Sequence, residues 1–470
     1  MKPAPEPKSD TRVWVNDVHS RLNPTPLCAL VVPGSLADLV ETVRTAAVIS
    51  VSGGRHAMGG QQFATDSTGV DMRKLNRILS FDFQLGLVEA EAGIQWPDLV
   101  NGCIAAQGDA PRWGIAQKQT GADTLSLGGS LSANVHGRGL AMPPIIHDVE
   151  SFTLVRADGE VVRCSRTERA DIFRLVIGGY GLFGIIYSVQ LRLAPRRRVR
   201  RVVEIIHVDN LMAGFERRIH EGCLYGDFQF SIDEDSPDFL LKGVFSCYQP
   251  TDDRADVDAG KNLSAAAWIE LLHLAYTNRA KVYDQYTAYY LSTHGQDYWS
   301  DEHQLGPYLP DYAEQISSLT GQPSPASLVI SELYVPRNQL ALFLRRAAAL
   351  LRERKVAVIY GTVRLIERDT ESFLPWARES YACIIFNLLT PHHPAGLEAS
   401  RRAFLGLIDL AASLGGSYFL TYHRHADRKR VEACYPQFAE FLALKKQHDP
   451  NERFQSDWYR HYRDEFAGSP

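Results

Sequence analysis

Residues 120–139 read TGADTLSLGGSLSANVHGRG, which is the most informative loop of the chain. Small residues and hydroxyl groups dominate it, and Asn134 and His136 lie near its end. A packed core avoids this composition, because buried polar groups must find hydrogen-bond partners. Leu125, Leu127 and Leu131 nevertheless indicate a buried element. We therefore interpret the stretch as a buried loop rather than a surface loop.

A second glycine-rich loop, Gly53–Gly60, reads GGRHAMGG. It joins a strand-like run at 47–51 to another at 69–72. Four glycines in eight residues allow several backbone N–H groups to turn inward, and such a concave backbone binds anions. A purely structural hairpin turn would need only two residues. The loop therefore predicts a phosphate-binding site.

A third loop, Gly179–Gly184, fits the pattern G-x-G-x-x-G. A dinucleotide fingerprint needs a strand before the glycines and a helix after them. Here a helical pattern at 171–177 precedes the motif and a strand pattern at 185–193 follows it, so we reject a Rossmann-type nicotinamide site. Three small-residue loops in one region instead suggest a long, flat, phosphorylated cofactor that lies between them.

The remaining pattern predicts an α+β chain of two to three domains. Ser35 is the expected N-cap of a helix at 36–47, and 157–159 is the expected turn of a hairpin. The arginine-rich run at 196–201 is interpreted as a solvated hinge and as the first domain boundary. The later chain has strand patterns at 228–232 and 355–360 and helical patterns at 340–351 and 399–414. Residues 251–322 form a long polar and aromatic segment that predicts a helical excursion, a mobile lid or an oligomer contact.

Composition excludes several classes of protein. The net charge of −5 over 470 residues argues against a nucleic-acid binder, which needs a basic face. No run approaches the roughly 20 apolar residues of a membrane span, and no secretory signal is visible. Seven scattered cysteines give no zinc or iron–sulfur framework, so we expect no metal site. We expect a cytoplasmic protein, and the oligomeric state stays open.

Taken in their order along the chain, the glycine-rich motifs resemble those of the vanillyl-alcohol-oxidase/PCMH flavoprotein superfamily. The similarity rests on the GGRHAMGG loop, the Gly128-Gly129…Asn134-x-His136-Gly137 segment, Ala157-Asp158-Gly159 and the Gly179–Gly184 turn. It looks strongest at 25–195, and the layout is most similar to aldonolactone and alditol oxidases and to decaprenylphosphoryl-ribose oxidase. The resemblance implies an FAD-binding domain at 1–200, in the two-part PCMH form. It also implies a cap domain at 201–415, with a large antiparallel sheet flanked by helices, and a segment at 416–470 that returns to the FAD-binding domain.

The resemblance also implies the cofactor-binding residues. Backbone groups of the first loop would hold the pyrophosphate of FAD: Ser52, Gly53, Gly54, Arg55, His56, Ala57, Met58, Gly59 and Gly60. The ribityl chain and the isoalloxazine would be lined by Gly121, Ser126, Gly128, Gly129, Asn134, His136 and Gly137. Ile185 and Ile186, after the Gly184 turn, would lie near the adenine. His56 occupies the position at which relatives with covalently bound flavin attach it, so we expect a covalent bond between His56 and the flavin. The 120–127 segment contains no cysteine that could form a second covalent bond to the flavin.

Five residues are candidates for catalysis. His423 has the side chain best suited to proton transfer, and Arg424 would stabilise reduced flavin or bind a substrate oxygen. Arg364 lies in a segment similar to the Glu-x-Arg segment of alditol-type relatives. Glu332 and Asn387 are polar residues in apolar strand runs, where plain strand alternation is an equal interpretation.

The expected function is FAD-dependent transfer of hydride from a CH–OH group of a small polar substrate, of the polyol, sugar or lactone class. Reoxidation by oxygen or by another acceptor stays open. A lipid-linked sugar, an aryl alcohol or an amine are alternative substrates. The alternative from another class is a flavin-fold protein that binds without catalysis.

Overall fold

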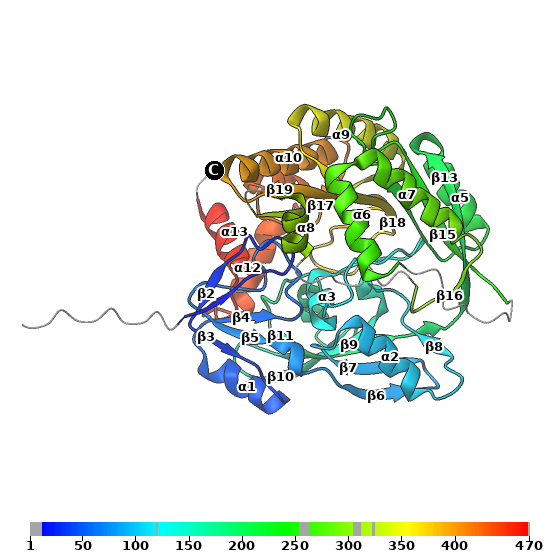
Figure 1. Ribbon diagram of the computed structural model, residues 1–470. Coiled ribbons are helices and arrows are strands. Elements are labelled where there is room, and N and C mark those ends of the chain that lie inside the picture. The colour runs from blue at the N-terminus through cyan, green and yellow to red at the C-terminus, as the bar shows by residue number, and fades with distance from the viewer. Residues whose placement is uncertain (1–11, 119–120, 253–262, 304–311, 322–324, 469–470) are drawn as a thin grey trace, which may run out of the picture.

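The computed structural model describes residues 12–118, 121–252, 263–303, 312–321 and 325–468. Figure 1 shows an α+β fold whose N-terminal part (blue to cyan) lies below a large sheet with its helices (green to orange). Thr120 and parts of the 251–322 segment lie outside the described residues. Within the described part, no helix has both the length and the apolar character needed to cross a membrane.

The N-terminal part begins with a small parallel sheet. Its strands, in spatial order, are β3 (Ala29–Val31), β5 (Thr68–Asp71) and β4 (Ile49–Ser52). The predicted helix is α1 (Leu36–Thr45), and the Ser35 side chain accepts a hydrogen bond from the Asp38 N–H, which confirms Ser35 as the N-cap. Ala46 already has extended backbone angles, so the following strand begins at Ile49 rather than at residue 47.

An antiparallel sheet follows and carries the predicted hairpin. Its spatial order is β10 (Val161–Ser165), β9 (Val149–Val155), β11 (Ile185–Arg192), β7 (Leu87–Glu91) and β6 (Ile78–Asp82). The helical segments of this region are η1 (Met72–Lys74), α2 (Trp96–Ala106), α3 (Leu127–Ala133), η2 (Ile145–Asp148) and α4 (Ala170–Val176). Two small sheets pair β1 (Val13–Val15) with β2 (Thr25–Leu27) and β8 (Trp113–Gly114) with β12 (Ala194–Pro195).

The G-x-G-x-x-G segment connects α4 to β11, so the helix precedes the glycines and the strand follows them. Gly181 has φ +74° and Gly184 has φ +147°, which are backbone conformations that a side chain would strain. A Cβ at Gly184 would also meet the backbone oxygen of Val155 at 2.8 Å. These glycines therefore make a tight turn against a neighbouring strand.

The second part is built on an eight-stranded sheet. Its spatial order is β16 (Asp297–Trp299), β13 (Arg198–His207), β15 (Lys242–Pro250), β14 (Tyr225–Phe230), β18 (Val358–Ile366), β19 (Tyr381–Pro391), β17 (Ala326–Pro336) and β20 (Ser417–Tyr418). All neighbouring strands of this sheet pair antiparallel. The predicted strand at 355–360 starts only at Val358, because Lys355 caps the preceding helix with φ +53°.

Helices cover both faces of this sheet. The outer face meets α5 (Val208–His220), α9 (Leu340–Arg354) and α10 (Pro394–Ser413), and η3 (Arg337–Gln339) contacts α9 (Figure 1). Phe245 contacts Phe215 of α5 on that face. The adjacent Val244 points the other way and packs with Tyr290 of α7 (Arg279–Ser292). We call the face that carries Val244 the inner face of the sheet.

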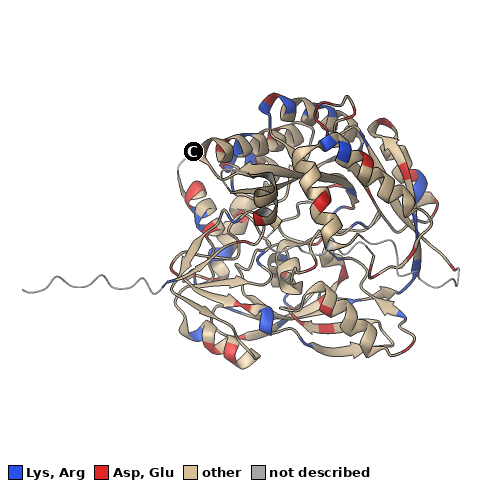
Figure 2. Ribbon diagram, viewed as in Figure 1, with Lys and Arg blue, Asp and Glu red and all other residues tan. Residues whose placement is uncertain are grey.

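The arginine-rich run is not a solvated hinge. Residues 198–201 belong to β13, and Arg196 is only 5% exposed while it pairs with Asp301. Arg201 is buried, and its guanidinium donates to the hydroxyl groups of Tyr248 and Thr293. The run therefore belongs largely to a paired strand. Carboxylate and aromatic partners much later in the chain neutralise or cover the charges of its arginines. Elsewhere, Figure 2 shows that positions with Lys or Arg and positions with Asp or Glu are interspersed along the ribbon of both parts of the molecule.

The described parts of the 251–322 segment are mainly helical. They comprise α6 (Ala265–Thr277), α7, β16 and α8 (Tyr312–Thr320). Helix α6 contacts β18, α7 contacts β13 and β15, and α8 contacts β17. Among the predicted alternatives, these contacts favour a helical excursion that packs on the sheet.

The C-terminal segment returns to the N-terminal part. It contains α11 (Arg428–Cys434), α12 (Phe438–His448) and α13 (Asp457–Ala467). The Ile49 N–H donates to the Arg453 carbonyl at 2.7 Å, and the Trp458 ring lies 5.0 Å from that of Tyr180. These contacts bring residues 419–425, just before α11, close to the glycine-rich loops.

Candidate active site

A cavity of about 1220 Å³, counting the open solvent at its mouth, lies where the three small-residue loops meet. Its wall includes residues 52–57 of the first loop. Gly121, Ser126, Gly128 and Gly129 line it from the second, and residues 184–186 line it after the third. Thirteen of the nineteen residues that the sequence assigned to cofactor binding therefore line one cavity, although the three loops are separated by long stretches of chain.

Close packing explains the glycines of the first loop. A Cβ on Gly53 would lie 1.9 Å from the Ser126 hydroxyl oxygen, and one on Gly54 would lie 2.2 Å from the Thr124 carbonyl oxygen. Real Cβ atoms do not approach so closely, so only glycine allows the two loops to touch here. The loops thereby form one continuous wall.

The wall also has polar groups that lack a partner. The N–H groups of Gly54, Arg55 and Ala57 donate to no acceptor among the described residues. Buried Arg55 Nε and Gln62 Oε1 likewise have no hydrogen-bond partner there. Buried polar atoms normally find partners, so these groups fit a polar ligand such as the diphosphate and ribityl groups of FAD.

Six of the expected cofactor-binding residues do not line the cavity. They are Met58, Gly59, Gly60, Asn134, His136 and Gly137. The Met58 N–H donates to the Thr421 carbonyl and the Gly59 N–H to Gln61 Oε1, so the protein itself uses these donors. Asn134 donates from its side chain to Asp369 at 2.9 Å and ties α3 to the second part of the molecule.

His56 lines the cavity and makes two side-chain contacts there. Its Nδ1 lies 2.7 Å from His19 Nε2, and its Nε2 lies 2.9 Å from the Thr124 hydroxyl. Burial lowers the pKa of His56 well below its ordinary value, and the neighbouring His19 lowers it further. The imidazole is therefore neutral near pH 7 and keeps a nucleophilic lone pair. His19, which also lines the cavity, lies far upstream of any motif and was missed from the sequence.

The opposite wall comes from the large sheet and from the segment after it. Ile330 of β17 and Phe419, Thr421 and Tyr422 line the cavity. Tyr422 was missed from the sequence, where only His423 and Arg424 of this segment were candidates.

Glu332 is the centre of a buried hydrogen-bond network behind this wall. Its Oε1 lies 2.8 Å from His136 Nε2 and accepts from the Tyr334 hydroxyl at 2.6 Å. Its Oε2 accepts from the Tyr422 hydroxyl at 3.0 Å. Burial alone would raise the pKa of Glu332, but His136 and the Tyr334 hydroxyl lower it below its ordinary value. The side chain is therefore a carboxylate that joins the cavity wall to the Asn-x-His-Gly loop.

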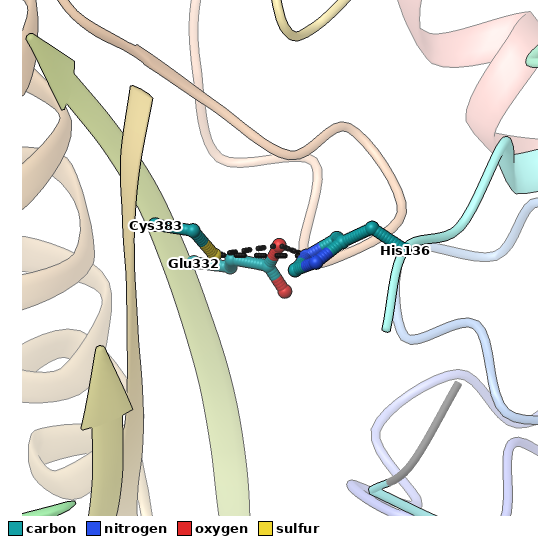
Figure 3. A group of neighbouring side chains, drawn as sticks. All are labelled: His136, Glu332 and Cys383. Carbon is teal, nitrogen blue, oxygen red and sulfur yellow. Dashed lines mark hydrogen bonds and ion pairs between the residues drawn. The ribbon is translucent and has the colours of Figure 1, made fainter. Parts of the chain in front are cut away.

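Cys383 completes the group drawn in Figure 3. Glu332 and Cys383 project from neighbouring strands toward His136, with Cys383 Sγ 3.4 Å from Glu332 Oε1. The three side chains have donor atoms that could hold a metal ion. A tetrahedral zinc would separate its nitrogen and oxygen ligands by about 3.3 Å, since each bond is about 2.0 Å. The observed 2.8 Å is a direct hydrogen bond, so we interpret the group as a hydrogen-bond network.

The two remaining candidates on the sheet differ in their surroundings. Asn387 of β19 donates to the Tyr360 carbonyl at 3.3 Å and is half-buried. Arg364 of β18 is 3% exposed, and its Nε and Nη1 have no hydrogen-bond partner among the described residues. Strand register places Asn387 beside Ile330, and places Arg364 beside Cys383. Both residues therefore lie on the same sheet face as the Glu332 network.

His423 and Arg424 do not line the cavity. His423 is buried against His425 with ring centroids 5.3 Å apart, and burial, followed by the nearby Arg424, lowers the pKa of His423 to about 4. Arg424 donates from Nη1 to the Gly59 carbonyl at 2.7 Å. Arg424 thus supports the glycine-rich loop from behind, and we no longer place its charge beside a substrate.

Comparison with known proteins identifies the first part of the chain. Residues 28–165 match the family described as FAD binding domain. An uncharacterized oxidoreductase encoded as ORF5 in the fasciation locus of Rhodococcoides fascians is 31% identical over 177 residues, which are 37% of this chain and 39% of that protein. Cytokinin dehydrogenase 9 of Oryza sativa subsp. japonica is 27% identical over 200 residues, 40% of this chain and 37% of the relative.

L-gulonolactone oxidase of Mus musculus is 30% identical over 149 residues, which are 32% of each chain. The matches thus span about a third to two fifths of each of these curated relatives. The resemblance inferred from the loops is confirmed by this family match and by these relatives. Residues 28–165 therefore match an FAD-binding domain, and the similar proteins support the resemblance to the PCMH-type FAD-linked oxidase superfamily, which includes the aldonolactone oxidases.

Proposed function

We propose that this protein is an FAD-dependent oxidoreductase that oxidises a CH–OH group of a small polar substrate. The observation that carries the proposal is the cavity itself. One wall of the cavity consists of the small-residue loops, with polar groups that lack a partner among the described residues. The opposite wall includes Ile330 and Tyr422. Such a cavity can hold a flat cofactor on one wall and present a substrate to it from the other.

The proposed architecture follows from the same arrangement. Residues 1–200 would form a two-part PCMH-type FAD-binding domain, 201–415 the cap over the substrate, and 416–470 the returning segment. The N–H groups of Gly54, Arg55 and Ala57 and the Arg55 side chain would hold the diphosphate. Residues 121–129 would lie along the ribityl chain and the flavin ring. Bound there, FAD supplies the acceptor for the hydride of the substrate C–H bond.

The chain itself would handle the hydroxyl proton. Tyr422 donates its own proton to Glu332, so its oxygen lone pairs remain free to accept a hydrogen bond from a substrate hydroxyl. Burial, and then the charge of Glu332, raise the pKa of Tyr422 well above its ordinary value, so no tyrosinate forms at rest. As the substrate hydroxyl releases its proton to Tyr422, the phenolic proton can pass to the Glu332 carboxylate. His136 would position Glu332 through their hydrogen bond.

We also propose a covalent bond between His56 and the flavin. The supporting observations are that His56 lines the cavity and that its burial keeps the imidazole neutral. Both ring nitrogens have partners, so the bond requires that one nitrogen leave His19 or Thr124. If Nε2 leaves Thr124 to form the bond, Nδ1 keeps its contact with His19, whose imidazole would accept the proton that His56 loses.

The decisive experiment mixes the FAD-loaded protein with a panel of polyols, sugars and sugar lactones without oxygen. Reduction of the bound flavin by one of these compounds, seen as loss of its visible absorbance, supports the proposal. If dithionite reduces the flavin but no alcohol does, the proposed activity is wrong. A panel of aryl alcohols and amines then tests the alternative substrate classes.

A further inference from the structure

The main chain of the segment that carries Tyr422 is held from outside the segment. Residues 419–427, all of which the structure describes, form an irregular connection between β20 and α11. An irregular connection has no ladder of backbone hydrogen bonds to fix the direction of its side chains. The position of Tyr422 therefore depends on contacts with other parts of the protein.

Three consecutive carbonyl groups of this segment accept hydrogen bonds from two residues at or just after the end of the first glycine-rich loop. The Gln61 side chain donates from Nε2 to the Leu420 carbonyl at 2.6 Å and to the Tyr422 carbonyl at 3.4 Å. The Met58 N–H donates to the Thr421 carbonyl at 3.0 Å. Gln61 therefore holds the main chain of Tyr422 directly.

A side-chain amide suits the place that Gln61 occupies. Gln61 is 5% exposed and lines the cavity. Its Oε1 accepts from the Gly59 N–H at 2.9 Å, which directs Nε2 and its two protons toward the carbonyl groups. A carboxylate of the same shape would keep the contact with Gly59. It would have no proton for the carbonyl oxygens, which would then lack their partner.

Tyr422 is thus fixed at both ends. Its hydroxyl donates to Glu332 Oε2 at 3.0 Å, and its carbonyl accepts from Gln61. The first contact reaches it from the large sheet, and the second reaches it from the FAD-binding part of the chain. The distance between the Tyr422 hydroxyl and the loop wall of the cavity consequently depends on both contacts.

We propose that Gln61 is a positioning residue for the oxidation, because it sets the Tyr422 hydroxyl at the distance from the loop wall that proton transfer requires. The inference rests on the proposed function and adds to it a residue that acts through Tyr422. A displacement of about 1 Å can slow an enzymatic step by about 100-fold, so loss of the Gln61 contacts should slow the reaction even in a folded protein.

A double-variant cycle between Gln61 and Tyr422 tests the inference without any substrate. Gln61→Glu removes both donated hydrogen bonds, and Gln61→Met removes them without adding a charge. The urea midpoint of unfolding is measured for each variant alone and combined with Tyr422→Phe. Tyr422→Phe should lower the midpoint of the wild type, because it takes a donor from buried Glu332. In either Gln61 variant it should lower the midpoint by less than about half as much, since the hydroxyl is already displaced.

Gln107→Glu is the matched control. The Gln107 side chain also donates to two main-chain carbonyls, those of Cys103 at 2.9 Å and Trp113 at 2.8 Å, and its Oε1 also accepts from main-chain N–H groups. Gln107 is the C-cap of α2 and lies outside the cavity wall. Tyr422→Phe should therefore have its full effect in the Gln107→Glu background.

The same cycle is then measured on the reduction of bound flavin, with the compound of the polyol, sugar and lactone panel that reduces the wild type fastest. Each Gln61 variant should slow reduction about 10- to 100-fold when Tyr422 is present. Neither should add much to the slowing that Tyr422→Phe causes alone. A purely structural role of Gln61 would slow both backgrounds equally.

The inference is overturned if the effects of the Gln61 and Tyr422 changes on unfolding are additive, or if the Gln61 variants reduce the flavin at the wild-type rate. If no compound of the panel reduces the flavin, the proposed function is contradicted. The unfolding cycle then decides alone whether Gln61 positions Tyr422.

Discussion

His136 Nε2 lies 2.8 Å from Glu332 Oε1, in a contact that joins two residues 196 positions apart. One residue follows α3 in the FAD-binding part, and the other lies on β17 of the large sheet. The contact is almost completely shielded from solvent, and it fixes the sheet over the cavity. The contact therefore couples the position of the large sheet to the loop that follows α3.

This contact predicts a large coupling in stability. Glu332→Ala should lower the free energy of unfolding by about 3 kcal/mol, because it leaves buried donors unpartnered. His136→Ala should destabilise similarly. The double variant should lose clearly less than the sum of the two, since the second change removes no further interaction. Urea unfolding of the four proteins measures the coupling, and strict additivity would contradict the proposed link.

Tyr422→Phe should slow reduction of the flavin by about 100-fold, the usual effect of removing a proton-transfer group. Retention of FAD should stay unchanged, because Tyr422 contacts Glu332 rather than the phosphate loop. Tyr435→Phe is the matched control, since Tyr435 is a buried tyrosine whose hydroxyl donates to the Tyr418 carbonyl and which does not line the cavity. Equal reduction rates for Tyr422→Phe and the wild type would remove Tyr422 from the mechanism.

Arg424→Ala should weaken the retention of FAD more than it slows reduction. The guanidinium holds the Gly59 carbonyl, so its loss loosens the glycine-rich loop by about one charge-assisted hydrogen bond, or about tenfold in affinity. From the sequence alone we expected the reverse, with Arg424 beside the flavin. Fluorescence titration of FAD in a His56→Ala background, where no covalent bond forms, measures retention, and Arg430→Ala on α11, which loses only exposed ion pairs, is the control. Unchanged FAD affinity with slow reduction would restore the earlier interpretation.

The His19–His56 pair predicts a pH dependence of stability. Burial lowers the pKa of His19 below its ordinary 6.5, so the unfolded chain binds this proton at a higher pH than the folded chain. The associated stability is present above pH 6.5 and is lost as the pH falls through the folded pKa. Below pH 6.5 the unfolding free energy of His19→Asn should therefore fall by less than that of the wild type. The difference should be at least about 1.4 kcal/mol, the equivalent of one pKa unit. A decline as steep as that of the wild type would exclude His19 as its source.

Acid precipitation tests the covalent bond through His56. Flavin should stay with the precipitated wild-type chain and should be released from His56→Ala, which keeps some bound FAD through the remaining loop N–H groups. His136→Asn is the control, because His136 does not line the cavity and should not carry the bond. A yellow supernatant over a colourless wild-type pellet would show that FAD is bound without a covalent bond.

Most residues that the sequence assigned to the cofactor line one cavity, whereas the five candidate catalytic residues do not line it, for a physical reason. Glycine and small residues are required wherever two loops approach as closely as Gly53 and Ser126, and this requirement is visible in composition. The role of Arg196 depends on Asp301, and no local pattern reports a partner so far along the chain. Tyr422 and His19 are single residues without a motif, so only their position on the cavity reveals them.

The measurement that tests the account most directly is the visible absorbance spectrum of the protein after incubation with FAD and removal of free cofactor. The cavity and its loops predict a yellow protein with one flavin per chain. Gly53→Val, whose side chain would collide with Ser126, should take up much less. A correctly folded wild-type chain that remains colourless would contradict the assignment of this cavity to FAD, and with it the proposed oxidation.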